Sequence, residues 1–132
     1  MTVPGLTTVK SSHDPRETMN RLEAAVTAKG LTVFARIDHA AGASAAGLSL
    51  RPTEVLIFGN AKGGTPLMQA VQTIGIDLPL KALVWQDASD NTWLSWNDAA
   101  WLAARHEISG AEAVVGRLTA VLDEIAKTAT AA

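Results

Sequence analysis

The segment from residue 82 to residue 96 constrains the fold more than any other part of the sequence. Two apolar runs, ALVW (82–85) and TWLSW (92–96), flank the turn-forming stretch DASDN. Strand-forming runs separated by such a turn are typical of a β-hairpin. Because the strands of a hairpin run in opposite directions, the sheet is predicted to be at least partly antiparallel. In the second run, Trp93 should face one side of the sheet, with Leu94 and Trp96 on the opposite face or next to it.

Strand and helix patterns alternate along the rest of the chain. EVLIFG (54–59) has no polar residue between Val55 and Phe58, which predicts a central strand covered on both faces. Thr65 followed by Pro66 has the pattern of a helix start, with Thr65 as the capping residue. The expected order is β-α-β-β-α-β-β-α-α, an α+β fold in which helices cover a small sheet of about five strands. The 132 residues predict a single domain, 1–132.

Composition excludes several classes of function. The net charge is −2 and the eleven Lys and Arg residues are scattered, whereas nucleic-acid binding needs clustered cations. No apolar stretch of ~18 residues predicts a membrane span, and the N-terminus lacks a signal-peptide pattern, so we expect a cytoplasmic protein. The chain has no cysteine, and its three histidines are not spaced as local metal ligands. We therefore expect no metal site and no cofactor.

The glycine-rich stretch IFGNAKGGTPLMQA (57–70) has the outline of a phosphate-binding loop but fails the test for one. Gly59 and Gly64 have the spacing of the P-loop glycines, but Thr65 stands where the lysine is required. Two readings of Gly63, Gly64 and Thr65 remain open. The free backbone N–H groups at a helix start attract an anion, or the glycines only form a turn that Thr65 caps.

The segment WNDAAWLAARH (96–106) brings aromatic and cationic side chains together. Trp96, Trp101, Arg105 and His106 could line a pocket. Alternatively, Arg105 and His106 only complement the negative end of a short helix. The sequence leaves both interpretations open.

Five phrases of the chain, in order, resemble the bacterial and archaeal domain of unknown function 302 family. The resemblance extends over nearly the whole chain, and it implies an α+β domain with no established activity and no agreed catalytic residues. The phrases are FARIDHAAGA (34–43), LRPTEVLIFGN (50–60), GTPLMQA (64–70), DLPLKALVW (77–85) and WNDAAWLAARH (96–106).

Twelve residues of this sequence match residues that recur in the family. The chain departs from the family pattern at Ala61, where proline is expected, and at Trp96 and Ala99, where tyrosine and proline are usual. These departures concern loop geometry and pocket polarity. The matching residues are Asp38, His39, Gly59, Asn60, Gly64, Thr65, Leu80, Lys81, Asn97, Asp98, Arg105 and His106.

Three functional hypotheses follow. The first is a small-ligand or anion-binding module without established catalysis. The second is a protein-interaction domain that forms a homodimer through a sheet face carrying Trp93. The third is an enzyme in which Arg105 and a histidine act on a small anionic substrate. The residues expected at the ligand site are His39, Asn60, Gly63, Gly64, Thr65, Arg105 and His106.

Overall fold

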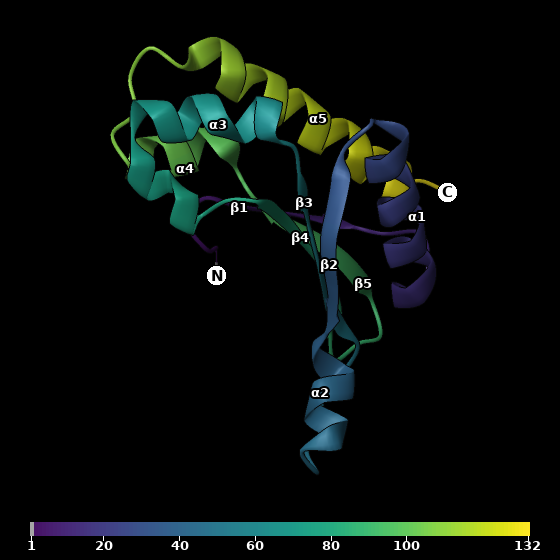
Figure 1. Cartoon of the computed structure of the whole chain (residues 1–132). Coiled ribbons are helices and arrows are strands. Elements are labelled where there is room, and N and C mark those ends of the chain that lie inside the picture. Colours follow the sequence, from purple (N-terminus) through teal and green to yellow (C-terminus); the bar gives the residue numbers. More distant parts are fainter. Residues whose placement is uncertain (1) are drawn as a thin grey trace.

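The computed structural model describes residues 2–132 and has five strands, with helices gathered on one face of their sheet (Figure 1). This confirms the predicted α+β fold. A short helix between the second and third strands and a 3-10 helix are added to the expected order. The strands are β1 (Leu6–Lys10), β2 (Thr32–Asp38), β3 (Thr53–Gly59), β4 (Leu80–Gln86) and β5 (Thr92–Asn97). The helices are α1 (Pro15–Ala28), α2 (His39–Ala45), α3 (Ala61–Ala70), η1 (Gln72–Ile76), α4 (Ala99–Arg105) and α5 (Glu112–Thr130).

The sheet is antiparallel at every pairing. Its strand order is β1-β5-β4-β3-β2, so β1 and β2 are the edge strands. The predicted hairpin forms between β4 and β5, with Trp85 opposite Trp93. Because β2 and β3 are also neighbours, Thr32 at the start of β2 lies opposite Gly59 at the end of β3. This corner of the sheet carries the candidate site described below.

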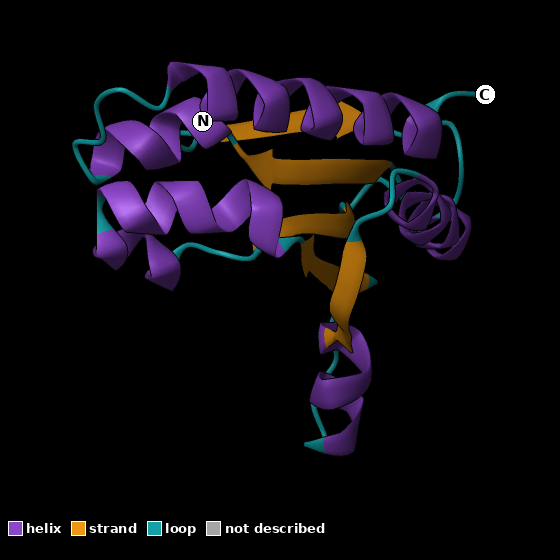
Figure 2. Ribbon diagram, turned by 45° about the horizontal axis from the view of Figure 1, so that its top comes forward, coloured by secondary structure: helices purple, strands orange, loops and turns teal. Residues whose placement is uncertain are grey.

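The core lies between the sheet and helices α1 and α5 (Figure 2). Alternate strand residues point into it, as a period of two requires. Leu94 and Trp96 are buried there, whereas Trp93 lies on the opposite face, as the sequence predicts. The other buried members include Leu56, Phe58 and Val84 from the strands and Met19, Leu22, Leu122 and Ile125 from the helices.

The second face of the sheet is open in residues 2–132. Its apolar side chains are only partly buried, and the helices gather on the other side. The prediction that EVLIFG is covered on both faces is therefore wrong for this chain alone. The prediction failed because a run of apolar residues makes both faces of a strand apolar but does not determine what packs against the second face. We call the side chains Val55, Ile57, Leu83, Trp85 and Trp93 the uncovered face.

Helix α3 begins five residues earlier than the sequence predicts. Asn60, not Thr65, is its capping residue, and its Oδ1 accepts a hydrogen bond of 2.7 Å from the Gly63 N–H. Thr65 and Pro66 lie inside the helix. Pro66 is the sixth residue of the helix, so α3 lacks the hydrogen bond that another residue there would donate to the Lys62 carbonyl. Asn and Thr are both good caps, so the pattern alone could not choose between them.

Candidate functional site

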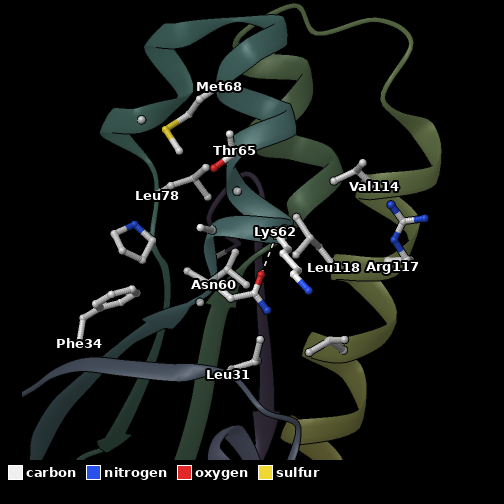
Figure 3. A pocket seen from close by; sticks show the side chains of 18 residues that line it. Leu31, Phe34, Asn60, Lys62, Thr65, Met68, Leu78, Val114, Arg117 and Leu118 are labelled. Carbon is white, nitrogen blue, oxygen red and sulfur yellow. Dashed lines mark hydrogen bonds between the residues drawn. The ribbon is translucent and has the colours of Figure 1, made fainter.

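A cavity of about 480 Å³ lies between α3, α5 and the corner where β2 begins and β3 ends (Figure 3). Its size falls within the range of small-molecule sites. The walls come from four separate stretches of the chain. They include Leu31, Phe34, Asn60, Lys62, Gly63, Gly64, Thr65, Met68, Gly75, Leu78, Pro79, Val114, Arg117, Leu118 and Val121.

The walls of the cavity are mainly apolar. Leu78 lies on the chain between η1 and β4, while Val114 and Leu118 come from the inward stripe of α5. Phe34 stands at the rim, 57% exposed, at a bulge in β2. Because the ring is already exposed beside the cavity, it can contact an apolar part of a ligand without any rearrangement of the core.

The cavity has a positive side. Lys62 projects from the first turn of α3, and Arg117 projects from α5, which forms another wall (Figure 3). Within residues 2–132 neither cation has an ion-pair partner, and no Asp or Glu lines the cavity. Two unpaired positive charges beside an apolar hollow favour a ligand with a negative end.

The start of α3 adds to this positive side. The first N–H groups of a helix have no partner within the helix, and the helix dipole places partial positive charge there. Asn60 satisfies the N–H of Gly63, and the Gly64 N–H bonds to the Asn60 carbonyl at 3.1 Å. The N–H groups of Ala61 and Lys62 are the remaining donors of that first turn.

Three glycines leave space in the cavity. A Cβ built on Gly64 would lie 3.6 Å from Leu78 Cδ1 and 3.8 Å from Met68 Cε, which is ordinary contact. Packing therefore does not require glycine at this helical position, although glycine destabilises a helix by about 1 kcal/mol relative to alanine. Gly63 and Gly75 have tighter surroundings, at 3.1 Å from Asn60 Oδ1 and 3.4 Å from Met68 Sδ.

The structure brings together four of the seven predicted site residues. Asn60, Gly63, Gly64 and Thr65 all line the cavity. His39 does not, because it lies on α2 beyond the opposite end of β2.

The register of β2 and β3 gives the scale of that separation. Asp38 pairs with Glu54, five residues from Gly59 along β3. At ~3.3 Å per residue this places His39 more than about 15 Å from the cavity. The expectation that His39 joins the glycine-rich helix start is wrong.

Arg105 and His106 also lie outside the cavity, in a separate cluster around Asp77. Arg105 Nη1 donates to both carboxylate oxygens of Asp77 at 2.7 and 2.8 Å, and His106 Nε2 donates to Oδ2 at 2.6 Å. The Thr73 hydroxyl and His106 Nδ1 form a hydrogen bond of 2.9 Å. The guanidinium is thus already occupied by a carboxylate, and the cluster joins η1 and its following turn to the end of α4.

The electrostatics of Asp77 follow from these contacts. Burial, the largest effect, acts to raise the pKa of Asp77, but the hydrogen bond from His106 and the charge of Arg105 together hold that pKa below its ordinary value. The carboxylate is therefore kept ionised and paired. The cluster therefore links the turn after η1 to the end of α4.

Sequence reasoning did not identify Lys62 or Arg117 as site residues. Lys62 comes before Gly63 and Gly64, whereas the lysine of a P-loop follows the second glycine, so the motif gives Lys62 no role. Arg117 lies in the last helix, more than fifty residues away in sequence, and no local motif links it to the glycine loop. Only the packing of α5 beside α3 brings the two cations to one cavity.

Among residues 2–132, no three His, Asp or Glu side chains lie close enough to hold a metal ion together. No helix in the same part of the chain has both the length and the apolar character needed to cross a membrane.

Comparison with known proteins now places the chain in a family. Residues 7–125 match the profile described as Domain of unknown function DUF302. The chain belongs to the DUF302 family. The crystal structure of an uncharacterized conserved DUF302 protein from Bacillus stearothermophilus has the same fold, with a TM-score of 0.85 over 96% of this chain and 99% of that one, at 19% identity.

The curated relatives of this DUF302 chain carry a functional name. Fluoride-specific ion channel FluC 1 of Brucella suis biovar 1 is 54% identical over 104 residues, which are 79% of this chain and 41% of that protein. The protein of the same name from Brucella abortus biovar 1 gives the same identity over 38% of its length. The chain thus spans about two fifths of the curated relatives that it matches.

Proposed function

We propose that this DUF302 domain binds a small molecule that has an apolar body and a negatively charged end. The observation that supports the proposal most strongly is the pair of unpaired cations, Lys62 and Arg117, beside an apolar cavity. In this account the apolar body lies against Leu78, Val114 and Leu118. The charged end lies near the start of α3, where Arg117 can donate to it in a forked arrangement.

The cavity volume limits the size of the ligand. A volume of 480 Å³ equals that of roughly sixteen water molecules at ~30 Å³ each, so a ligand of roughly ten to fifteen non-hydrogen atoms fits. Decanoate, a straight-chain carboxylate of this size, is a suitable probe. Decanol has the same apolar body without the charge, and inorganic phosphate has the charge without the apolar body.

Isothermal titration calorimetry with these three probes tests the proposal. We expect decanoate to bind more tightly than decanol, and phosphate to bind weakly because it leaves the apolar walls unfilled. The double variant Lys62→Met/Arg117→Met keeps the apolar stems and should weaken decanoate binding by about tenfold or more, since a hydrogen bond to a charged group contributes about 1.5 kcal/mol or more.

The matched control for this experiment is Lys127→Met, which removes a cation from α5 away from the cavity. Its decanoate affinity should equal that of the wild type. Failure of the wild type to bind either decanoate or decanol would overturn the proposal. Equal weakening by the control would mean that only the net charge of the protein attracts decanoate.

The name of the Brucella relatives makes fluoride a necessary further probe. A small, strongly hydrated ion gains little from apolar walls, because leaving water costs more than such walls return. We therefore expect millimolar fluoride to leave the melting temperature unchanged under conditions in which decanoate raises it. A specific stabilisation by fluoride that chloride does not reproduce would contradict the proposed ligand class.

The uncovered face supports a second proposal, that the domain is a homodimer. Trp85 and Trp93 stack there with ring centroids 6.2 Å apart, beside Val55, Ile57 and Leu83. A contiguous apolar sheet face of this kind is characteristic of an interaction surface. Sedimentation velocity at micromolar concentration should give the mass of two chains, and a monomer at that concentration would contradict this proposal.

The enzymatic alternative receives less support. The Arg105 guanidinium is paired with Asp77, and His106 donates to the same carboxylate, so neither is free to meet an anionic substrate. A cytoplasmic location remains a prediction from the sequence.

A further inference from the structure

A segment that we call the arm, residues 39–52, projects beyond the end of the sheet (Figures 1 and 2). It consists of α2 and the stretch that returns to β3. None of the residues of α2 is buried, and Leu48 and Leu50 are 68% and 50% exposed. The arm contacts its own chain mainly at β3, which begins at Thr53 directly after the arm.

Such an arm is unfavourable for an isolated chain in water. Helices shorter than about 12–15 residues are marginal without tertiary packing, and Gly42 lowers the helix propensity further. The arm's local support is confined to its two caps. Asp38 Oδ1 accepts from the Ala41 N–H at 2.9 Å, and at the other end the Leu48 N–H donates to the Ala43 carbonyl at 2.8 Å. The arm therefore needs a surface against which α2, Leu48 and Leu50 can pack.

The uncovered face begins at the base of the arm. Thr53, the first residue after the arm, lies opposite Trp85, and the Pro52 carbonyl accepts a hydrogen bond of 3.0 Å from the Gln86 N–H. The stacked pair Trp85 and Trp93 thus lies beside the point where the arm leaves the sheet. The arm extends away from this face, so it does not cover the face of its own chain.

These two surfaces complement each other under two-fold symmetry. In an isologous dimer each surface contacts the partner surface to which it is complementary, and the same contact occurs twice. An axis near the tryptophan pair brings the arm of each chain over the uncovered face of the other. Each chain then contributes an arm and an uncovered face, so two copies of the same protein are sufficient to form the contact.

The size of the two surfaces fits a stable dimer. The twelve residues 39–50 and ten residues of the open sheet face together make twenty-two, within the roughly 20–30 residues per side of a standard interface. The ten share the face opposite the helices. They are Thr8, Lys10, Ala35, Ile37, Val55, Ile57, Lys81, Leu83, Trp85 and Trp93.

We infer that two copies of this chain exchange arms, with the arm of each packed on the uncovered face of the other. This inference rests on the homodimer proposed above and names the segment that forms its contact. The occupant of the uncovered face is the partner's arm, with Leu48 and Leu50 as its apolar contacts.

Shortening the arm tests the inference. Asp38 and Glu54 are directly paired, so the two residues Asn-Gly can replace residues 39–53 as a tight hairpin turn. We expect the shortened chain to dimerise at least about tenfold more weakly than the wild type in sedimentation equilibrium, equivalent to about 1.4 kcal/mol. Ile76→Ser, at a 73% exposed position outside the arm, is the matched control and should dimerise normally.

A milder variant covers the case in which the shortened chain does not fold. Leu48→Ser/Leu50→Ser changes two exposed side chains, which should leave the monomer fold intact and still weaken the dimer. If the wild type is a dimer and both arm variants dimerise equally well, the arm inference is overturned and the homodimer stands. If the wild type is a monomer, both proposals fall.

Cross-linking tests the placement of the arm directly. The chain has no cysteine, so introduced thiols are the only reactive ones. Leu50→Cys protein mixed with Lys10→Cys protein and a short bismaleimide should give a covalent product containing one chain of each. Ile76→Cys mixed with Lys10→Cys provides the background level, and a yield no higher than that background would overturn the inference.

Discussion

At the scale of single residues, the glycines of α3 show where the sequence departs from what stability alone favours. Alanine fits at Gly64 without a clash, and it would strengthen the helix. Departures from local rules are expected at functional sites. The sequence showed these glycines clearly but could not show that they face a cavity, because Leu78 and Leu118 approach them only in the folded chain.

The variant Gly64→Ala should separate stability from binding. We expect it to stabilise the fold by about 0.5–1 kcal/mol in urea unfolding, because alanine is the better helix former. The added methyl group occupies part of the cavity, so decanoate should bind more weakly.

Gly116→Ala is the control for this prediction. Gly116 lies in α5 with nothing within 4 Å of a built Cβ, so the same stabilisation should appear there with unchanged decanoate affinity. Weaker binding in both variants would show that helix stability, rather than lost space, controls the affinity.

At the scale of elements, the sequence located most helices and strands but not their contacts. The hairpin of β4 and β5 was predictable because its turn and strand residues are adjacent in sequence. The start of α3 was not, because Asn60 and Thr65 both have cap-forming side chains. The sequence brings Arg105 and His106 to notice, but no local pattern links them to Asp77, which lies nearly thirty residues earlier.

Asp77→Asn should loosen the attachment of α4 to η1. The variant removes the charge that Arg105 and His106 both contact, so we expect a loss of about 1–3 kcal/mol in urea unfolding at pH 7. Asp90→Asn, at an exposed turn, should change stability little.

The pH dependence of that loss follows from the lowered pKa of Asp77. A carboxyl whose pKa is lower in the folded state stabilises the fold fully above its unfolded pKa, about 3.9, and loses this contribution as the pH falls through the folded pKa. The difference between wild type and Asp77→Asn should therefore be constant at neutral pH and shrink below about pH 4. A difference that persists undiminished at lower pH would contradict the role given to this charge.

At the scale of the whole molecule, the fold class and order of elements were predictable because they depend on local patterns. The strand order β1-β5-β4-β3-β2 and the opening of one sheet face depend on contacts between distant segments, which no local pattern records. The candidate site likewise has a part that local sequence predicts and a part that depends on packing. Asn60, Gly63, Gly64 and Thr65 are contiguous and were found together, whereas Arg117 joins them only through the packing of α5.

The most direct test of the proposed ligand site is a ¹H–¹⁵N correlation spectrum of the wild type during titration with decanoate. Glycine amide signals report on both the cavity and the rest of the molecule. The account predicts that Gly59, Gly63, Gly64 and Gly75, which line the cavity, shift with a common saturation curve. Gly30, Gly42 and Gly110, which lie outside it, should stay in place. Saturable shifts confined to the second group, or no shifts at all, would contradict the account.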